Sequence, residues 1–175
     1  MTARVRAVGI AVVLVGAWGA LIPFVGPLFG YRMGNVTAWT WSESHATLHL
    51  VPGVVALVGG VLMLGAARGR ARLGAVLALL GGAWFILGPT FHPAWASGDG
   101  MASGGGMMMM GGGVWNGIAS ALGYHYGTGV VIGALGAYAL GVLANVTPVA
   151  ARGVTAVPSS AGAAEPTDQE YARVG

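Results

Sequence analysis

The sequence predicts an all-α membrane protein with four transmembrane helices, built as two parallel two-helix repeats. Composition is the first indication: 55% of the 175 residues are hydrophobic, 33 are glycine and only 7% are charged, whereas a soluble domain carries about 25% charged residues. The second indication is four apolar stretches of membrane-spanning length, and the third is a residue pattern shared by the two halves of the chain. We therefore expect the lipid bilayer, and no nucleic acid, as the partner of this chain.

The four apolar stretches cover about residues 5–24, 45–67, 73–91 and 118–144, and apart from Arg6 at the start of the first none contains Arg, Lys, Asp or Glu. About 20 apolar residues cross the hydrocarbon core of a bilayer. Lipid cannot bond to backbone N–H and C=O groups, so each stretch should be a helix. We expect residues 1–150 to form one four-helix transmembrane domain. Residues 151–175 carry three of the five acidic residues and no periodic pattern of apolar residues. This composition predicts a disordered cytoplasmic tail.

The arginines predict the orientation, since cytoplasmic loops carry an excess of basic residues. Arg4 and Arg6 lie at the start of the first span, three arginines lie in residues 68–72 between the second and third spans, and Arg152 follows the fourth. Arg32 alone lies in a connection on the other side. Both termini are therefore predicted to be cytoplasmic in a multi-pass protein of the plasma membrane. We interpret the first stretch as a retained span, because its apolar run is long for a signal peptide.

The two halves of the chain are similar in sequence. A shift of 66 residues superimposes Gly16-Ala17-Trp18 on Gly82-Ala83-Trp84, and a shift of 76 superimposes His49 on His125 and Gly53-Val54-Val55 on Gly129-Val130-Val131. Such similarity is typical of a duplicated unit, with repeat 1 at about residues 5–67 and repeat 2 at about 73–144. Both copies begin on the same side, so we expect them to be related by a pseudo-two-fold axis along the membrane normal.

The repeat carries a recurring pattern of Trp and Pro. Its first copy reads Gly-Ala-Trp-x4-Pro-Phe-Val at residues 16–25, and Trp-Asn at residues 115–116 opens the last span. The pattern resembles the SPW-repeat integral membrane proteins, whose two-helix unit carries a Trp, a Ser-Pro-Trp or Ser-Pro-Phe corner and a following Trp-Asn. The corners here read Ile-Pro-Phe at residues 22–24 and Gly-Pro-Thr at residues 88–90, without the serine. The resemblance covers about residues 8–144 and implies the membrane topology, but no activity.

Residue types near the ends of the spans predict where the helices begin and end. Proline and glycine should end the first helix of each repeat at the outer interface. Thr40 with Glu43 three residues later is typical of a capping box for the second helix. Tryptophan suits the headgroup level of a bilayer, and five are placed there: Trp18, Trp39, Trp41, Trp84 and Trp115.

The fourth span carries a small residue at every fourth position: Gly129, Gly133, Ala137 and Gly141. Such a stripe lets another helix approach closely in lipid. No catalytic constellation accompanies it, and the chain contains no cysteine to serve as nucleophile or thiolate ligand. We therefore expect a small non-enzymatic membrane protein that acts through helix–helix association, either as a homo-oligomer or as the accessory subunit of a membrane-protein partner.

Four histidines are candidates for binding a cofactor: His45, His49, His92 and His125. His49 and His125 each lie 19 residues from the cytoplasmic end of their span, which is about 28 Å at 1.5 Å per residue. Both should therefore point into the bundle at one depth. His45 lies one helical turn from His49 on the same face.

Three interpretations of the histidines remain open. In the first, His45, His49 and His125 bind copper or zinc, helped by His92 and the methionines at 107–110, since imidazole suits both metals and thioethers suit Cu(I). In the second, His49 and His125 are the axial ligands of haem b. In the third, the histidines are interfacial polar residues that bond to the backbone or to neighbouring side chains, namely Ser42, Ser44, Tyr124 or Tyr126.

Overall fold

The computed structural model describes residues 3–31, 37–95, 118–119 and 121–145. The Met/Gly run at 104–113, the Trp-Asn pair at 115–116 and the tail at 151–175 lie outside the described residues, so the predictions made for them stay predictions. Every regular element within the described ranges is helical. The elements follow one another in four rods, one for each predicted span.

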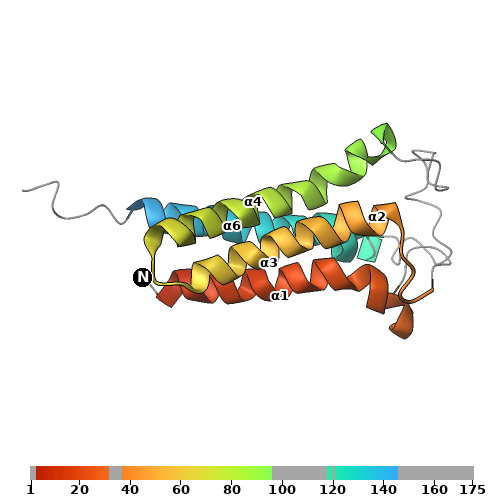
Figure 1. Cartoon of the computed structure of the whole chain (residues 1–175), viewed down its shortest axis with the longest axis horizontal. Helices are drawn as coiled ribbons and strands as arrows, with labels where there is room; N and C mark the ends of the chain where they lie inside the picture. The colour runs from red at the N-terminus through yellow and green to blue at the C-terminus, as the bar shows by residue number, and fades with distance from the viewer. Residues whose placement is uncertain (1–2, 32–36, 96–117, 120, 146–175) are drawn as a thin grey trace, which may run out of the picture. The chain divides into compact units, whose positions relative to one another are not determined.

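The four rods are continuous runs of helix (Figure 1). The first joins α1 (Ala3–Val25) to the 3₁₀ turn η1 (Gly26–Phe29). The second joins α2 (Glu43–His45), the π-helical turn η2 (Ala46–Leu50) and α3 (Val51–Leu64). The third joins α4 (Arg68–Phe91) to the 3₁₀ turn η3 (His92–Ala94), and the fourth joins the π-helical turn η5 (Leu122–Tyr126) to α6 (Gly127–Asn145).

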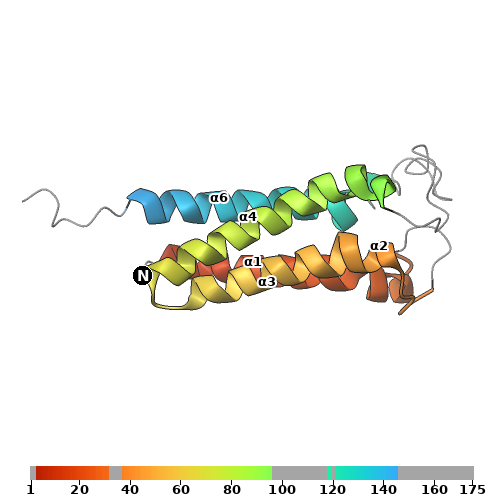
Figure 2. The same cartoon turned by 45° about the horizontal axis from the view of Figure 1, so that its top comes forward.

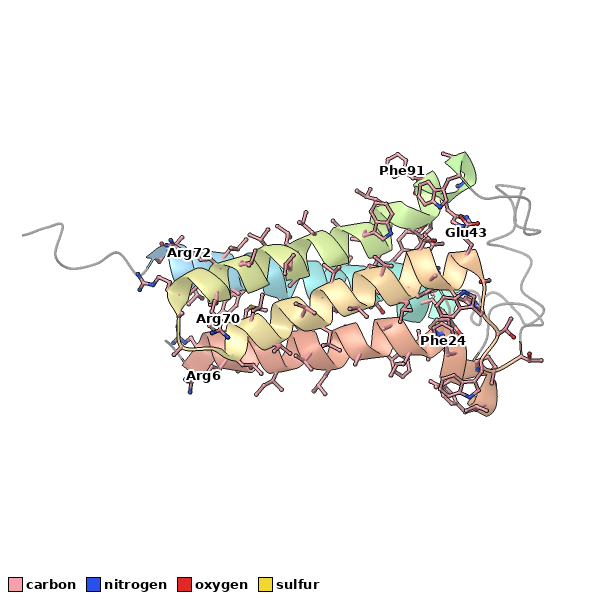
Figure 3. All side chains as sticks on the ribbon, viewed as in Figure 1. Arg6, Phe24, Glu43, Arg70, Arg72 and Phe91 are labelled. Atoms are coloured by element: carbon pink, nitrogen blue, oxygen red, sulfur yellow. The ribbon has the colours of Figure 1, made fainter. Side chains whose placement is uncertain are left out.

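The rods pack side by side in an up-and-down order. Helix α3 packs along α1 and α4, and α6 packs along α4, whereas the contact between α1 and α6 is smaller. Figure 2 shows α4 starting beside α3 and crossing toward α6 at its other end. Figure 3 places three labelled residues at each end of the bundle. We call these the arginine end (Arg6, Arg70, Arg72) and the aromatic end (Phe24, Glu43, Phe91).

Glycines allow the helices to approach closely at these contacts. A Cβ added at Gly60 of α3 would lie 2.8 Å from the carbonyl oxygen of Gly9 in α1, and one at Gly59 would lie 2.5 Å from a carbonyl oxygen of α4. A Cβ at Gly82 of α4 would lie 2.5 Å from the backbone nitrogen of Gly133 in α6. Only glycine fits at such distances. Association of helices in lipid depends on this close packing, because lipid tails are as apolar as the side chains.

The outward faces of the rods are apolar. All four rods in the described part of the chain are long and apolar enough to cross a membrane. Large side chains such as Leu14, Leu80 and Val130 are exposed by 66%, 58% and 58%, where the helix of a soluble protein would carry polar residues. The prediction of an all-helical fold with four apolar spans is therefore confirmed.

A proline lies inside each of the helices α1 and α4, at Pro23 and Pro89, and another follows each helix end, at Pro27 and Pro93. Helix α1 continues past Pro23 to Val25, and α4 continues past Pro89 to Phe91. A proline removes one hydrogen bond to the preceding turn. The residues that follow can keep helical angles, and an apolar surrounding favours this because the helix satisfies their backbone groups.

The second rod begins with a different cap from the predicted one. The Ser42 hydroxyl accepts a hydrogen bond from the His45 backbone N–H at 3.1 Å, which makes Ser42 the N-cap of α2. The Thr40 hydroxyl instead donates to the Thr37 carbonyl at 2.8 Å. The predicted capping box of Thr40 with Glu43 is therefore wrong, because serine caps as well as threonine and Ser42 directly precedes the first helical residue.

Candidate functional site

Two buried histidines face each other inside the bundle, on the side of the aromatic end. The ring centres of His49 and His125 lie 4.4 Å apart, and each side chain is only 3% exposed. His49 comes from the second rod and His125 from the fourth. The structure thus brings together the two histidines that the sequence places at one depth.

Both histidines lie in π-helical turns, which the sequence pattern did not predict. His49 is the fourth residue of η2, and His125 is the fourth residue of η5. A π turn adds a residue to the helical winding and so changes the direction of the side chains before it, and such turns are frequent at functional sites. The two turns therefore set how the imidazole rings point into the bundle.

A tryptophan from a neighbouring rod holds each π turn. The indole N–H of Trp84 donates to the Thr47 carbonyl at 2.9 Å, and that of Trp18 donates to the Gly123 carbonyl at 3.2 Å. Each acceptor is the second residue of its π turn, two residues before the histidine. The Thr128 hydroxyl also donates to the Gly123 carbonyl, at 2.7 Å. These bonds supply partners to carbonyls in a region where an unpaired backbone group is costly.

Aromatic side chains form much of the wall around the histidine pair. The rings of Phe85 and Tyr124 approach His49 edge-on, with centre distances of 6.3 and 5.6 Å. Both are almost fully buried. The Tyr124 hydroxyl is committed as a donor to the Tyr31 carbonyl at 2.8 Å. The described surroundings of the imidazoles are therefore mainly apolar.

Tyr31, which follows the first rod, contacts Tyr124 of the last rod and Ala119 just before it. Its ring stacks on that of Tyr124 with centres 5.0 Å apart and planes 11° from parallel. Its hydroxyl donates to the Ala119 carbonyl at 2.7 Å, and its backbone N–H donates to the Gly26 carbonyl at 3.0 Å. Burial raises the pKa of the Tyr31 phenol above its ordinary value, which keeps the phenol protonated as a donor.

The Nδ1 atoms of both paired histidines are buried and have no hydrogen-bond partner among the described residues. A buried polar atom without a partner costs about 1–3 kcal/mol, and buried side-chain nitrogens are seldom left in this state. Two such atoms in touching rings indicate a place where a further group would be stabilised. A metal ion is one such group, because neutral imidazole is the commonest metal ligand in proteins.

His45 and His92 stand apart from this pair. The His45 ring centre lies 6.3 Å from that of His49, but its Nδ1 lies 2.8 Å from the Thr40 carbonyl oxygen and is already engaged. His92 packs edge-on against Trp95 at 5.7 Å and has a buried Nε2 without a partner in the described part of the chain. No group of three or more His, Asp or Glu side chains among the described residues is arranged to hold a metal ion. The structure therefore does not assemble all four histidines into one site.

The small residues of α6 are divided between two faces of the helix. Gly129 faces α4, because a Cβ added there would lie 2.7 Å from the Gly82 carbonyl oxygen. At Gly133 and Gly141 an added Cβ would meet nothing within 4 Å, and Ala137 is exposed. The described helices of the chain therefore leave the space beside three of the four predicted packing residues open.

Sequence reasoning missed the residues that position and surround the histidine pair. It placed Trp18 and Trp84 at the headgroup level, gave no role to Phe85, and considered Tyr124 only as a hydrogen-bond partner of the histidines. A signal for the tryptophans was present, since the 66-residue shift that superimposes them is part of the same duplication that pairs the histidines. The contacts of Phe85 and Tyr124 depend on the packing of three rods and leave no mark in the sequence pattern.

The fold and the site define a multi-pass membrane protein with four apolar helices and a buried histidine pair. The chain matches no protein-family model, no curated protein and no solved structure. The histidine pair is the feature of the described residues that carries the clearest chemistry.

Proposed function

We propose that the protein is a non-enzymatic membrane protein that binds a transition-metal ion between His49 and His125. One observation carries the proposal: the two buried rings lie 4.4 Å apart and each has an Nδ1 atom without a partner among the described residues. A metal–imidazole bond of about 2.0 Å puts an ion roughly 3 Å from each ring centre. One ion can therefore contact both rings in a bent arrangement, and imidazole suits both copper and zinc.

The same ring distance favours a metal ion over haem b. Two axial imidazoles on opposite sides of an iron have their ring centres roughly 6 Å apart, with the porphyrin between them. Rings with centres 4.4 Å apart touch each other. A porphyrin would fit between them only if the second and fourth rods moved apart.

Metal analysis of protein purified without a histidine tag tests the proposal. After loading with copper or zinc salts and removal of excess metal, we expect one ion per chain in the wild type and none in His49→Ala or His125→Ala. His45→Ala is the matched control and should keep the ion, because the His45 ring centre lies 6.3 Å from that of His49, outside the touching pair. A wild-type protein that retains neither metal would contradict the proposal.

We also propose that the chain is a tandem repeat of two parallel hairpins. The bond from Trp18 to Gly123 and the bond from Trp84 to Thr47 support this arrangement, because the shifts of 66 and 76 residues exchange one bond for the other. A pseudo-two-fold axis between the paired histidines would relate the two bonds. The resemblance to SPW-repeat membrane proteins is part of the same proposal.

Helix–helix association through α6 is a second candidate function. The observation that favours it is the open space beside Gly133 and Gly141, with the exposed Ala137 between them. A second copy of the chain or another membrane protein would find small residues to pack against there. Gly133→Leu should then lower the oligomeric state in lipid, whereas Val131→Leu, on another exposed face of α6, should not. An unchanged oligomeric state in Gly133→Leu would remove this candidate.

A further inference from the structure

The ligand set around the histidine pair is small. Within the described part of the chain, two imidazoles meet and no third His, Asp or Glu joins them to form a metal-holding group. Zinc sites in proteins usually have four ligands, of which at least three come from the protein. Copper(I) is a softer ion that tolerates fewer ligands, and imidazole and thioether groups both suit it.

The ligand set is also uncharged. Glu43 is the only acidic residue within the described ranges, and it lies six residues before His49, at the aromatic end of the bundle (Figure 3). The chain has no cysteine to supply a thiolate. The Tyr124 hydroxyl donates a hydrogen bond to the Tyr31 carbonyl and so keeps its proton and stays neutral. An ion held by the pair therefore keeps its full charge.

The charge of the ion matters because the site is buried. The imidazoles are each 3% exposed, and Phe85 and Tyr124 pack against His49. The cost of moving an ion out of water rises with the square of its charge, so it is about four times larger for a divalent ion than for a monovalent one of similar size. Without an anionic ligand, this site penalises Zn(II) and Cu(II) far more than Cu(I).

We infer that the His49–His125 pair is a copper(I) site that discriminates against divalent ions. The inference rests on the proposed function, since it names the ion for the same two histidines. Two neutral ligands, the absence of a third His, Asp or Glu joining them among the described residues and the near-complete burial of both rings all favour a monovalent ion.

Competition titrations on the full-length protein in detergent test this inference. Copper(I) is added anaerobically against a chromophoric copper(I) chelator, and zinc(II) is added against a zinc chelator under the same conditions. We expect one copper(I) per chain, bound roughly 100-fold or more tightly than zinc(II). Zinc(II) binding that equals or exceeds copper(I) binding would overturn the inference and leave the proposed function standing. Failure of both ions to bind would overturn both.

Variants assign the copper(I) to the pair. His49→Ala and His125→Ala should each weaken copper(I) binding by roughly 100-fold, because a single imidazole remains. His92→Ala is the matched control, since His92 is also buried with an unpartnered nitrogen but packs on Trp95 instead of on the pair. Copper(I) affinity that survives in both His49→Ala and His125→Ala would overturn the assignment.

A measurement on the wild type keeps the inference testable if an alanine variant fails to fold. X-ray absorption at the copper edge should show nitrogen neighbours at about 2 Å and a low coordination number typical of copper(I). Four nitrogen or oxygen neighbours, or an oxidised spectrum under anaerobic conditions, would overturn the inference.

Discussion

Trp18 and Trp84 link the lipid-facing surface of the bundle to its histidine pair. Their rings are 45% and 41% exposed, yet their indole N–H groups reach backbone carbonyls in the π turns that carry His49 and His125. An amphipathic ring is suited to this position, because its apolar body can face lipid while its single donor points inward. The two tryptophans are therefore positioning residues for the histidines.

Replacing Trp84 with Phe should destabilise the fold. The change keeps an aromatic ring but leaves the Thr47 carbonyl without its indole donor, and an unpaired polar group away from water costs about 1–3 kcal/mol. Reversible unfolding in mixed micelles, followed by circular dichroism, would measure the fall in the free energy of unfolding. Trp41→Phe is the matched control, because Trp41 is 66% exposed and makes a ring contact with Phe24 that Phe can replace. Equal losses in both variants would show that the N–H group is not the cause.

Tyr31 should titrate late at alkaline pH. Burial raises its pKa, so folding favours the protonated phenol, and this contribution to stability is complete below the ordinary tyrosine pKa of about 10. It is lost as pH rises through the raised pKa. The difference in tyrosinate absorbance between wild type and Tyr31→Phe isolates this residue. A midpoint at the ordinary value would contradict the clamp seen between Tyr31 and Ala119.

At the scale of the elements, the contacts between rods depend on where glycine faces a neighbour. Gly82 and Gly133 show the contrast, because they lie at the same crossing of α4 and α6. A Cβ at Gly82 would lie 2.5 Å from the backbone nitrogen of Gly133, whereas a Cβ at Gly133 would point into open space. Two glycines in contact with each other thus have opposite tolerance for a side chain.

The variants Gly82→Ala and Gly133→Ala should therefore change stability in opposite directions. Gly82→Ala forces α4 and α6 apart, and overpacking of this kind costs about 1–3 kcal/mol. Gly133→Ala meets no atom and gains the higher helix propensity of alanine, up to about 1 kcal/mol. Unfolding of the two variants in the same micelles would compare them. A destabilised Gly133→Ala would indicate that a second helix already occupies the open face.

The length and apolar character of the four rods could be predicted from the sequence, but their local breaks could not. Spans were predicted within a few residues because lipid crossing demands a long apolar run. The cap at Ser42 and the continuation past Pro23 and Pro89 depend on local hydrogen bonds that several residues can satisfy equally well. The π turns are held by tryptophans from other rods, so no local pattern encodes them.

The candidate site was predictable to a similar degree. Counting residues along two duplicated helices placed His49 and His125 at one depth, and the structure has their rings in contact. The His45 ring centre lies 6.3 Å from that of His49, and its Nδ1 forms a hydrogen bond with the Thr40 carbonyl. That bond forms only in the folded connection before α2, which a helical count does not describe.

At the scale of the whole bundle, the two ends differ in chemistry. Arg6, Arg70 and Arg72 lie at one end, and the rings around Phe24 lie at the other (Figure 3). Arg72 also donates to the Leu143 carbonyl at 3.3 Å, which fastens the start of α4 to the end of α6. Basic residues favour the cytoplasmic side of a membrane, so this asymmetry supports the orientation with the arginine end in the cytoplasm.

Cysteine-accessibility labelling should reveal this orientation, and the absence of native cysteine makes the background clean. Gly69→Cys lies at the arginine end, where an added Cβ meets nothing within 4 Å, and Thr37→Cys lies in the exposed connection at the aromatic end. A membrane-impermeant maleimide should label Thr37→Cys in intact cells and Gly69→Cys only after permeabilisation, because arginine-rich connections favour the cytoplasmic side of a membrane. The opposite pattern would invert the topology. Labelling of both variants in intact cells would mean that the chain does not cross the membrane between residues 37 and 69.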